Sequence, residues 1–288
     1  MFDTFRRSWE LAKASLSVLR SDKELLVFPL VSFVALVIVT ASFAVPWLLA
    51  GGLQETERGG PGLLTYVLAF LFYLVSYTVI FFCNTALVGA ALIRLDGGDP
   101  TLSDGFRIAM SRLPQIIGYA LIAATVGMIL RLISEHAGIL GDIVAGIVGF
   151  AWSVATYLAV PVLVVERVGP IEAIKRSAAL LRKTWGEQLA GNVGIGIVFG
   201  LLAFLILLVG AAIVVAVVQS SPMLAFAVVV LTILAMGAVG LVGAAASGIF
   251  TASLYRYATK GDPGTAFRAE TVNTAFQRKD NTAATQKI

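Results

Sequence analysis

The polar side chains inside the long apolar runs of this sequence are those whose position could support binding or catalysis. Two runs each contain a carboxamide, Asn84 in one and Asn192 in the other. At such positions a carboxamide forms hydrogen bonds between helices or contacts a polar group of a bound molecule. No Asp, Glu, Lys or Arg lies at the middle of an apolar run, although ion-coupled transporters place such groups there. The pattern argues against ion coupling, and leaves hydrogen bonding between helices or contact with a neutral substrate.

Groups that could carry catalysis or hold a metal ion are few elsewhere in the chain. The chain has one cysteine, Cys83, so it cannot form an internal disulfide. It has one histidine, His136, so a site of several histidines is excluded. Asp96, Asp99 and Asp104 lie near a glycine-rich turn, but their spacing does not match a calcium-binding loop. The chain has no motif for a nucleophile, a phosphate-binding loop or a metalloprotease. We therefore predict no catalytic residue, no metal site, no cofactor and no enzymatic activity.

Basic residues gather in segments that separate the apolar runs, and these are the best candidates for binding. The clearest segment is 164–185, where Gly169-Pro170 precedes a helical pattern with basic residues on one face. Beside an anionic leaflet each exposed cation contributes on the order of 1 kcal/mol. The alternative is that these charges only set the topology of the chain. The residues expected to contact lipid headgroups are Arg6, Arg7, Lys175, Arg176, Arg182 and Lys183.

The elements that must position these residues are long apolar helices. The chain is 58% hydrophobic and only 13% charged, whereas a soluble domain carries about 25% charged residues. Runs of about 20 apolar residues cross a bilayer as helices. We therefore predict an all-α fold, a polytopic transmembrane helical bundle of six spans with amphipathic interfacial helices on the cytoplasmic side. The predicted spans are 25–50, 63–93, 114–132, 139–165, 189–218 and 223–254.

The distribution of charge predicts how the chain is oriented. Of the 21 Lys and Arg residues, only Arg58 and Arg131 lie in the loops on one side of the predicted spans. Basic loops stay in the cytoplasm, so both termini are expected on the cytoplasmic side. The protein itself is expected in the cell (inner) membrane. The same rule accounts for the basic pI of 9.3, and without a nucleic-acid motif no such partner is expected. The expected partners are the lipid bilayer and its anionic cytoplasmic leaflet; no pattern indicates a protein partner or a homo-oligomer.

A similar unit recurs along the predicted membrane domain, residues 1–260. Amphipathic segments precede hairpins of two spans in units 1–93, 101–165 and 171–258, and a Gly-Pro or Gly-x-Pro turn follows each unit. Pro170 suits the first position of a helix, because its φ is preset and its missing N–H is not needed there. Independent selection for helix starts is the alternative to a threefold repeat. Residues 261–288 are expected to form a cytoplasmic tail, weakly amphipathic and then disordered.

Three further expectations concern packing and ion pairs. The first amphipathic segment places Trp9, Leu16 and Leu19 on one face, which suits either the membrane interface or the protein's own cytoplasmic surface. Small residues recur along the last span, and such spacing lets helices approach closely in lipid. Glu166 and Arg167 are expected to form structural ion pairs, with Arg94 and Asp96 as candidate partners. The small residues are Gly237, Gly240, Ala244 and Gly248.

The basic segment also resembles a known prokaryotic group. The matching residues are Glu166, Gly169-Pro170, Ala173-Ile174-Lys175-Arg176-Ser177, Leu180 and Trp185. They are similar to an E-x-x-G-P-x-x-A-x-x-R-S-x-x-L…W pattern found in uncharacterised six-span proteins and in the membrane domain beside glycerophosphodiester phosphodiesterases. The resemblance implies six spans with amphipathic linkers over most of 1–260. It implies no established activity, and the chain has no room for the soluble barrel that hydrolyses phosphodiesters.

These observations predict a non-enzymatic membrane protein that organises the membrane, contacts lipid or binds a partner. The alternative is a transporter or channel for a neutral or lipid-like solute, which predicts a continuous cavity between spans that reaches Asn84 or Asn192. A membrane-embedded enzyme would need converging polar groups, and the sequence does not show them.

Overall fold

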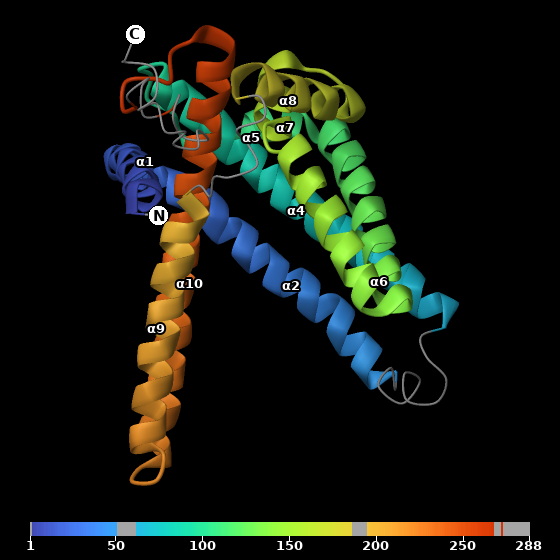
Figure 1. Cartoon of the computed structure of the whole chain (residues 1–288), viewed down its shortest axis with the longest axis vertical. Helices are drawn as coiled ribbons and strands as arrows, with labels where there is room; N and C mark the ends of the chain where they lie inside the picture. The colour runs from blue at the N-terminus through green and yellow to red at the C-terminus, as the bar shows by residue number, and fades with distance from the viewer. Residues whose placement is uncertain (1, 51–61, 186–194, 268–271, 273–288) are drawn as a thin grey trace, which may run out of the picture.

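The computed structural model describes residues 2–50, 62–185, 195–267 and 272, and within these ranges it contains helices and no strand (Figure 1). The predicted last span, 223–254, lies within the helix Pro222–Lys260. The predicted start of the fifth span, residue 189, lies outside the described residues. The elements are α1 (Phe2–Ser21), the 3-10 helix η1 (Lys23–Leu26), α2 (Val27–Leu49), α4 (Leu63–Leu95), α5 (Leu102–Ser111), α6 (Leu113–Ala155), α7 (Ala159–Glu166), α8 (Pro170–Trp185), α9 (Ile195–Val217) and α10 (Pro222–Lys260).

Six helical segments of the described chain are long and apolar enough to cross a membrane, which confirms the predicted fold class. α6 supplies most of two of them, because Gly138 breaks it with a φ of 55° and a ψ of −144°. Glycine suits this turn, since a positive φ is strained for residues with a Cβ. The six segments are Lys23–Leu49, Leu63–Leu95, Leu113–His136, Gly138–Glu166, Val198–Val217 and Pro222–Lys260.

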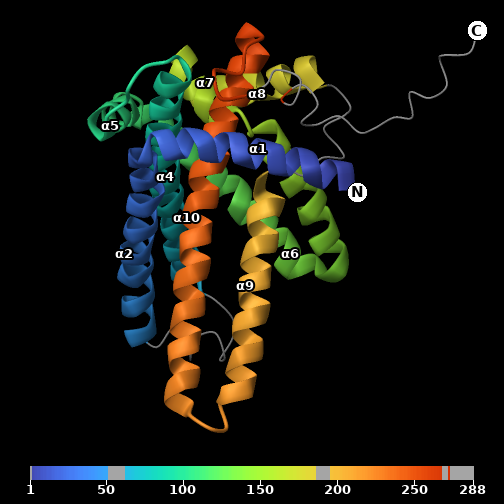
Figure 2. The same cartoon turned by 90° about the vertical axis from the view of Figure 1, so that its left-hand side faces the viewer.

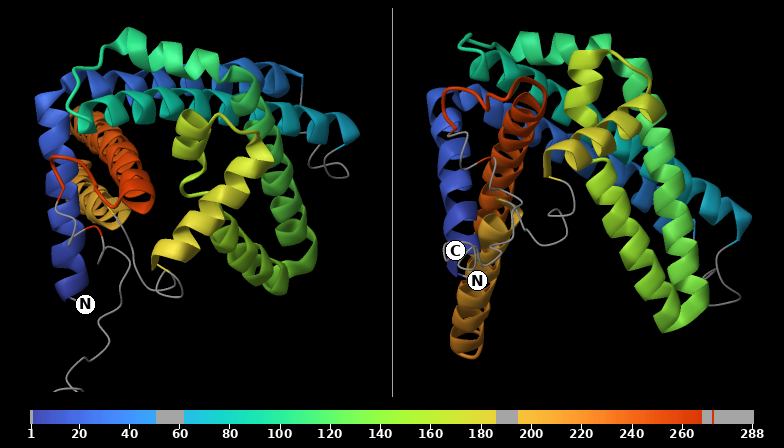
Figure 3. Two further views of the ribbon diagram at one scale, coloured as in Figure 1. Left: turned by 90° about the horizontal axis from the view of Figure 1, so that it is seen from above. Right: turned by 45° about the horizontal axis from the view of Figure 1, so that its top comes forward.

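The spans diverge from one shared end of the molecule (Figures 1 and 2). α4 is central and packs against α2, α5, α6, α7 and α10, whereas α9 packs along α10 and forms a separate hairpin. α1, α5 and α8 lie across the shared end, as seen from above in Figure 3. We call this the basic end, made of α1, α5, α7, α8 and the last turns of α4 and α10. The opposite end, with the turns at Gly138 and Ser220-Ser221, is the loop end.

The buried core sits at the basic end. Residues 85–92 of α4 are all buried, as are most residues of 245–256 in α10. Phe28 and Leu25, at the start of the first span, are 1% exposed and join the same cluster. Toward the loop end large apolar side chains are exposed instead, as expected of helices that face lipid. The molecule therefore has a close-packed end that can hold polar groups at fixed positions.

The amphipathic helices turn their apolar faces onto the bundle. In α1 the buried face differs from the prediction: Leu11, Ala12 and Leu19 are buried, whereas Trp9 is 42% exposed and lies under the Lys13 ammonium. The helix therefore packs on the protein's own surface, as one of the two readings predicts, and both readings can hold together; a place in the membrane interface stays a prediction. In α5 and α8 the buried residues are Gly105, Ala109, Ala173, Ser177, Leu180 and Leu181.

The starts of these helices follow from local sequence. Thr101 caps α5 in a capping box with Asp104, in which each side chain accepts from the other residue's backbone N–H. Pro170 is the first residue of α8, as predicted. The element order places an amphipathic helix before each hairpin; the triplication itself stays a prediction.

The predicted fourth span is not one continuous helix. α6 ends at Ala155 and α7 begins at Ala159, and Pro161 lies in the first turn of α7. Proline inside a helix removes one hydrogen bond and collides with the preceding turn. The break leaves the Leu158 N–H without a helical partner, and this group donates to the buried Ser177 Oγ of α8 at 2.9 Å. The break thereby fixes α8 against the end of the span.

Candidate functional site

The basic residues of α8 are the predicted site that the structure describes best. Lys175, Arg182 and Lys183 are exposed and lie opposite the buried face of the helix. Within the described chain no carboxylate lies at ion-pair distance from these three cations. Arg176 differs, because its Nε donates to Glu166 Oε2 at 3.0 Å. Three of the four predicted cations of α8 are therefore available to an anionic partner, and the fourth holds the helix in place.

Three other predicted site residues, Arg6, Arg7 and Asn192, have side chains outside the part of the chain that the structure describes. Arg6 and Arg7 belong to α1. The predicted grouping of α1 and α8 cations on one surface stays a prediction.

A network of ionic and hydrogen-bonding groups joins the helices at the basic end. Glu166 accepts a hydrogen bond from the Tyr255 hydroxyl at 3.2 Å as well as the one from Arg176. Arg256 is only 9% exposed, and its guanidinium pairs with Asp96 and, at 2.7 Å, with Asp262. The network links α4, α7, α8 and α10, and buried charges of this kind need such partners.

Glu166 forms an ion pair, as predicted, but its partner is Arg176. The prediction that Arg94 or Asp96 pairs with Glu166 or Arg167 is wrong. Asp96 is bound by Arg256, and Arg94 is bound by Asp99 at 3.0 Å. Arg167 ends α7 in the left-handed region with a φ of 56°. Arg256 was not among the residues predicted to form ion pairs. An arginine within the last turns of an apolar helix was the available signal that a carboxylate lies nearby.

Two aspartates at the basic end illustrate opposite electrostatics. The pKa of Asp262 lies below its ordinary value because the Gly264 N–H and then the Arg256 guanidinium bind the carboxylate. The pKa of Asp22 is raised, chiefly by burial, and its Oδ2 has no hydrogen-bond partner among the described residues. Asp262 is a stabilised anion, whereas Asp22 carries an unmet desolvation cost.

The three aspartates once considered as metal ligands are held separately. Asp96 and Asp99 pair with Arg256 and Arg94, while Asp104 binds Thr101 and Arg107. In the described part of the chain no group of three or more potential metal ligands is present. This arrangement gives each aspartate a structural role.

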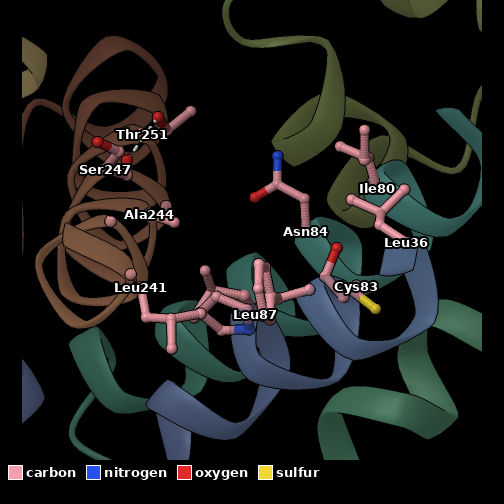
Figure 4. Close-up of a pocket in the computed structure, with 15 residues that line it drawn as sticks. Leu36, Ile80, Cys83, Asn84, Leu87, Leu241, Ala244, Ser247 and Thr251 are labelled. Atoms are coloured by element: carbon pink, nitrogen blue, oxygen red, sulfur yellow. Dashed lines mark hydrogen bonds between the residues drawn. The ribbon is translucent and has the colours of Figure 1, made fainter. Parts of the chain in front are cut away.

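A cleft opens between α2, α4 and α10, directly beneath the network. Its volume is about 540 Å³. Figure 4 shows the Asn84 side chain projecting from α4 into this space toward the face of α10 that carries Ser247 and Thr251. None of its lining residues is charged. They are Pro29, Ser32, Phe33, Leu36, Ile80, Cys83, Asn84, Leu87, Gly237, Gly240, Leu241, Ala244, Ser247, Gly248 and Thr251.

The cleft is closed toward the basic end by direct contact of α4 with α10. A Cβ added at Gly248 would collide with the Leu87 side chain, so close packing of a small residue is confirmed there. At Gly237 and Gly240 nothing lies within 4 Å of an added Cβ. The small-residue stripe therefore does not pack against another helix along its whole length, because its lower part lines the cleft.

The fold and these features define a class: a helical protein with six membrane-length segments whose polar network and basic surface lie at one end. Residues 63–266 match the family described as a family of unknown function, DUF6159, and the chain belongs to this family. No curated protein and no solved structure matches the chain. The matched range runs from the first residue of α4 to just beyond α10, and it includes α8 and Asn84.

Proposed function

We propose that the protein is a non-enzymatic, lipid-contacting module of the cell membrane, with its basic end in the cytoplasm. The observation that carries the proposal is a set of exposed cations on α8, Lys175, Arg182 and Lys183, that have no ion-pair partner among the residues that the structure describes. These side chains project from a helix that lies across the ends of the spans (Figure 1). A cation at this level attracts phosphate groups of anionic lipids, at about 1 kcal/mol each.

The mounting of α8 supports this role. Ala173, Ser177 and Leu181 are at most 1% exposed, so the apolar face is used in packing and the helix does not need to insert into the bilayer. Ser177 and Arg176 bind α7 through Leu158 and Glu166. A helix held in this way presents its charges at a constant height, which favours contact with headgroups over conformational switching.

The distribution of Lys and Arg supports the proposed orientation, because among the described residues all of them except Arg131 lie at or next to the basic end. The resemblance to the membrane domain found beside glycerophosphodiester phosphodiesterases is in line with a role among lipids. A membrane-organising or partner-binding role would use the same exposed surface of α8, with an acidic protein in place of lipid phosphate.

The test is lipid selectivity of the reconstituted full chain. We expect wild-type protein in mixed phosphatidylglycerol and phosphatidylcholine vesicles to enrich spin-labelled phosphatidylglycerol at its surface. The triple variant K175Q/R182Q/K183Q should lose most of this enrichment at low salt, because each cation removed contributes about 1 kcal/mol. Raising the ionic strength should weaken wild-type enrichment, because the Debye length falls to about 8 Å at 0.15 M.

Two matched variants separate this effect from general changes in charge. Glu172→Gln removes an exposed anion from the same helix and should increase the enrichment slightly. Arg107→Gln removes an exposed cation of α5 that already pairs with Asp104, and should change little. Wild-type enrichment in the triple variant would show that α8 does not bind lipid headgroups.

A second candidate function is a transporter for a neutral or lipid-like solute, and the cleft that reaches Asn84 favours it. Closure by Leu87 and Gly248 supports a binding cleft over an open channel. Lipid exchange between leaflets of reconstituted vesicles, faster than in protein-free vesicles, would support transport; equal rates would leave the lipid-contacting role alone.

A further inference from the structure

We propose that the cleft between α2, α4 and α10 holds one glycerolipid of the leaflet at the basic end. A glycerol-ester carbonyl or hydroxyl would bind Asn84, and an acyl chain would run past Gly240 toward the loop end. This site uses none of the α8 cations, so it does not rest on the proposed function. Its recognition would be indifferent to headgroup charge.

The first argument for a bound lipid is the position of the cleft relative to the membrane surface. α1 lies across α9 and α10 at the height where α2 and α9 begin (Figure 2). An amphipathic helix in this position marks the boundary between the apolar and polar zones of a bilayer. Pro29 and Ser32, in the first turns of α2, line the cleft. Its upper end therefore lies just below the boundary, where the ester groups of lipids are found.

The depth of the cleft carries the second step. Along α10 its lining extends from Thr251 to Gly237. At 1.5 Å per residue this distance is about 20 Å, of the order of one leaflet in a hydrocarbon core about 30 Å thick. The cleft volume of about 540 Å³ falls in the range of small-molecule sites, about 300–1,000 Å³. A single lipid chain with its ester group fits these dimensions.

The chemistry of the lining carries the third step. Polar side chains, Asn84, Ser247 and Thr251, gather at the upper end (Figure 4). The Thr251 hydroxyl already donates to the Ser247 carbonyl at 2.8 Å. The Asn84 carboxamide has no hydrogen-bond partner in the described chain, and such a group in an apolar setting favours a ligand that supplies one. Without a charged lining residue, a neutral polar group suits this position.

The open space along α10 carries the last step. Gly237 and Gly240 leave room where any larger side chain would enter the cleft, and nothing lies within 4 Å of their added Cβ atoms. The lower lining is otherwise apolar, with Phe33, Leu36 and Leu241 on the two sides. A hydrocarbon chain fills such a surface without any unmet polar group.

The test is photolabelling of the full chain in phosphatidylcholine vesicles. The probe is phosphatidylcholine with a diazirine in one acyl chain, and labelled peptides are identified by mass spectrometry. We expect the strongest labelling on peptides that contain Leu36 and Leu241. Gly240→Leu fills the cleft and should reduce this labelling about fivefold, whereas Gly146→Leu should not change it. Gly146 is a matched control, because it is an exposed helical glycine with equal free space.

Asn84→Leu serves as a second variant that removes the hydrogen bond at similar side-chain size. It should reduce cleft labelling about fivefold, the loss expected for one hydrogen bond. Wild-type labelling in both Gly240→Leu and Asn84→Leu would overturn the proposal. Labelling at Leu36 and Leu241 no stronger than at the exposed Leu234 of α10 would also overturn it.

The two lipid proposals fail separately. A diazirine phosphatidylglycerol probe should label the cleft as strongly as the phosphatidylcholine probe, and K175Q/R182Q/K183Q should leave this labelling unchanged. Cleft labelling that requires the anionic headgroup would contradict the neutral site. Loss of anionic-lipid enrichment in the triple variant bears only on α8.

Discussion

The two halves of α10 have opposite surroundings. Near the loop end its large apolar side chains are exposed, with Met223 at 83% and Phe226 at 70%. Near the basic end Phe250 and Leu254 are at most 1% exposed, and the Ser253 hydroxyl donates to the Pro263 carbonyl at 2.8 Å. One half faces the medium, and the other half is packed as in the core of a soluble protein.

The comparison shows where polar contacts determine the structure. Near the loop end apolar side chains meet a medium as apolar as themselves, so little favours one position of the hairpin over another. At the basic end ion pairs and buried hydrogen bonds specify a single arrangement. The cleft lies between the closely packed basic end and the lipid-facing loop end, where α10 diverges from α4. Substitutions at the basic end should therefore cost stability that equivalent changes elsewhere do not.

The largest effect is expected for Arg256→Met. The change removes the pairs with Asp96 and Asp262 from a side chain that is 10% exposed. We expect a loss of about 3 kcal/mol, because the guanidinium anchors α10 to two other segments. Thermal unfolding in detergent, followed by circular dichroism, measures it. Arg107→Met removes an exposed pair and should leave the midpoint unchanged; equal midpoints for both variants would refute the contrast.

A pair of glycine substitutions tests the contrast in packing. In Gly105→Ala the new Cβ would collide with the Phe28 ring and lie 2.9 Å from the Ala86 carbonyl oxygen. Overpacking of this kind costs about 2 kcal/mol. In Gly146→Ala the Cβ meets nothing within 4 Å, and alanine should stabilise the helix by about 0.5–1 kcal/mol. The same unfolding assay should give shifts of opposite sign, and shifts of the same sign would contradict the packing described.

The smallest effect is expected for Asp22→Asn. Burial raises the pKa of Asp22 above its ordinary 3.8, so the folded chain binds this proton more readily than the unfolded chain. Wild-type stability should therefore fall as pH rises from about 3.8 through the raised pKa. Asp22→Asn lacks this loss and should unfold at a higher temperature at neutral pH, with the difference shrinking toward pH 4. A constant difference across that range would contradict the role of burial.

Periodicity and composition predicted the elements of this fold well. The six spans and the start of α8 at Pro170 follow from local rules, because each depends on residues close in sequence. The break before α7 was missed, because it depends on Ser177, 19 residues away, which accepts from Leu158. Pro161 was the only local signal of it.

The candidate site was predictable only in part, for the same reason. Exposed cations on α8 follow from helical spacing, but the pairing of Arg176 with Glu166 requires the chain to turn back at Gly169. The partners of Arg256 lie as far as 160 residues away. Asn84 stood out as a polar residue in a span, and only the divergence of α10 from α4 gives it a cleft. Long-range geometry of this kind leaves no periodic trace in the sequence.

The most direct test of the account compares two variants in one preparation of mixed phosphatidylglycerol and phosphatidylcholine vesicles. Anionic-lipid enrichment and cleft photolabelling are both measured for K175Q/R182Q/K183Q and for Gly240→Leu. The account predicts that the triple variant loses only the enrichment and Gly240→Leu loses only the labelling. Retention of anionic-lipid enrichment by the triple variant would contradict the central claim that the basic end contacts lipid headgroups.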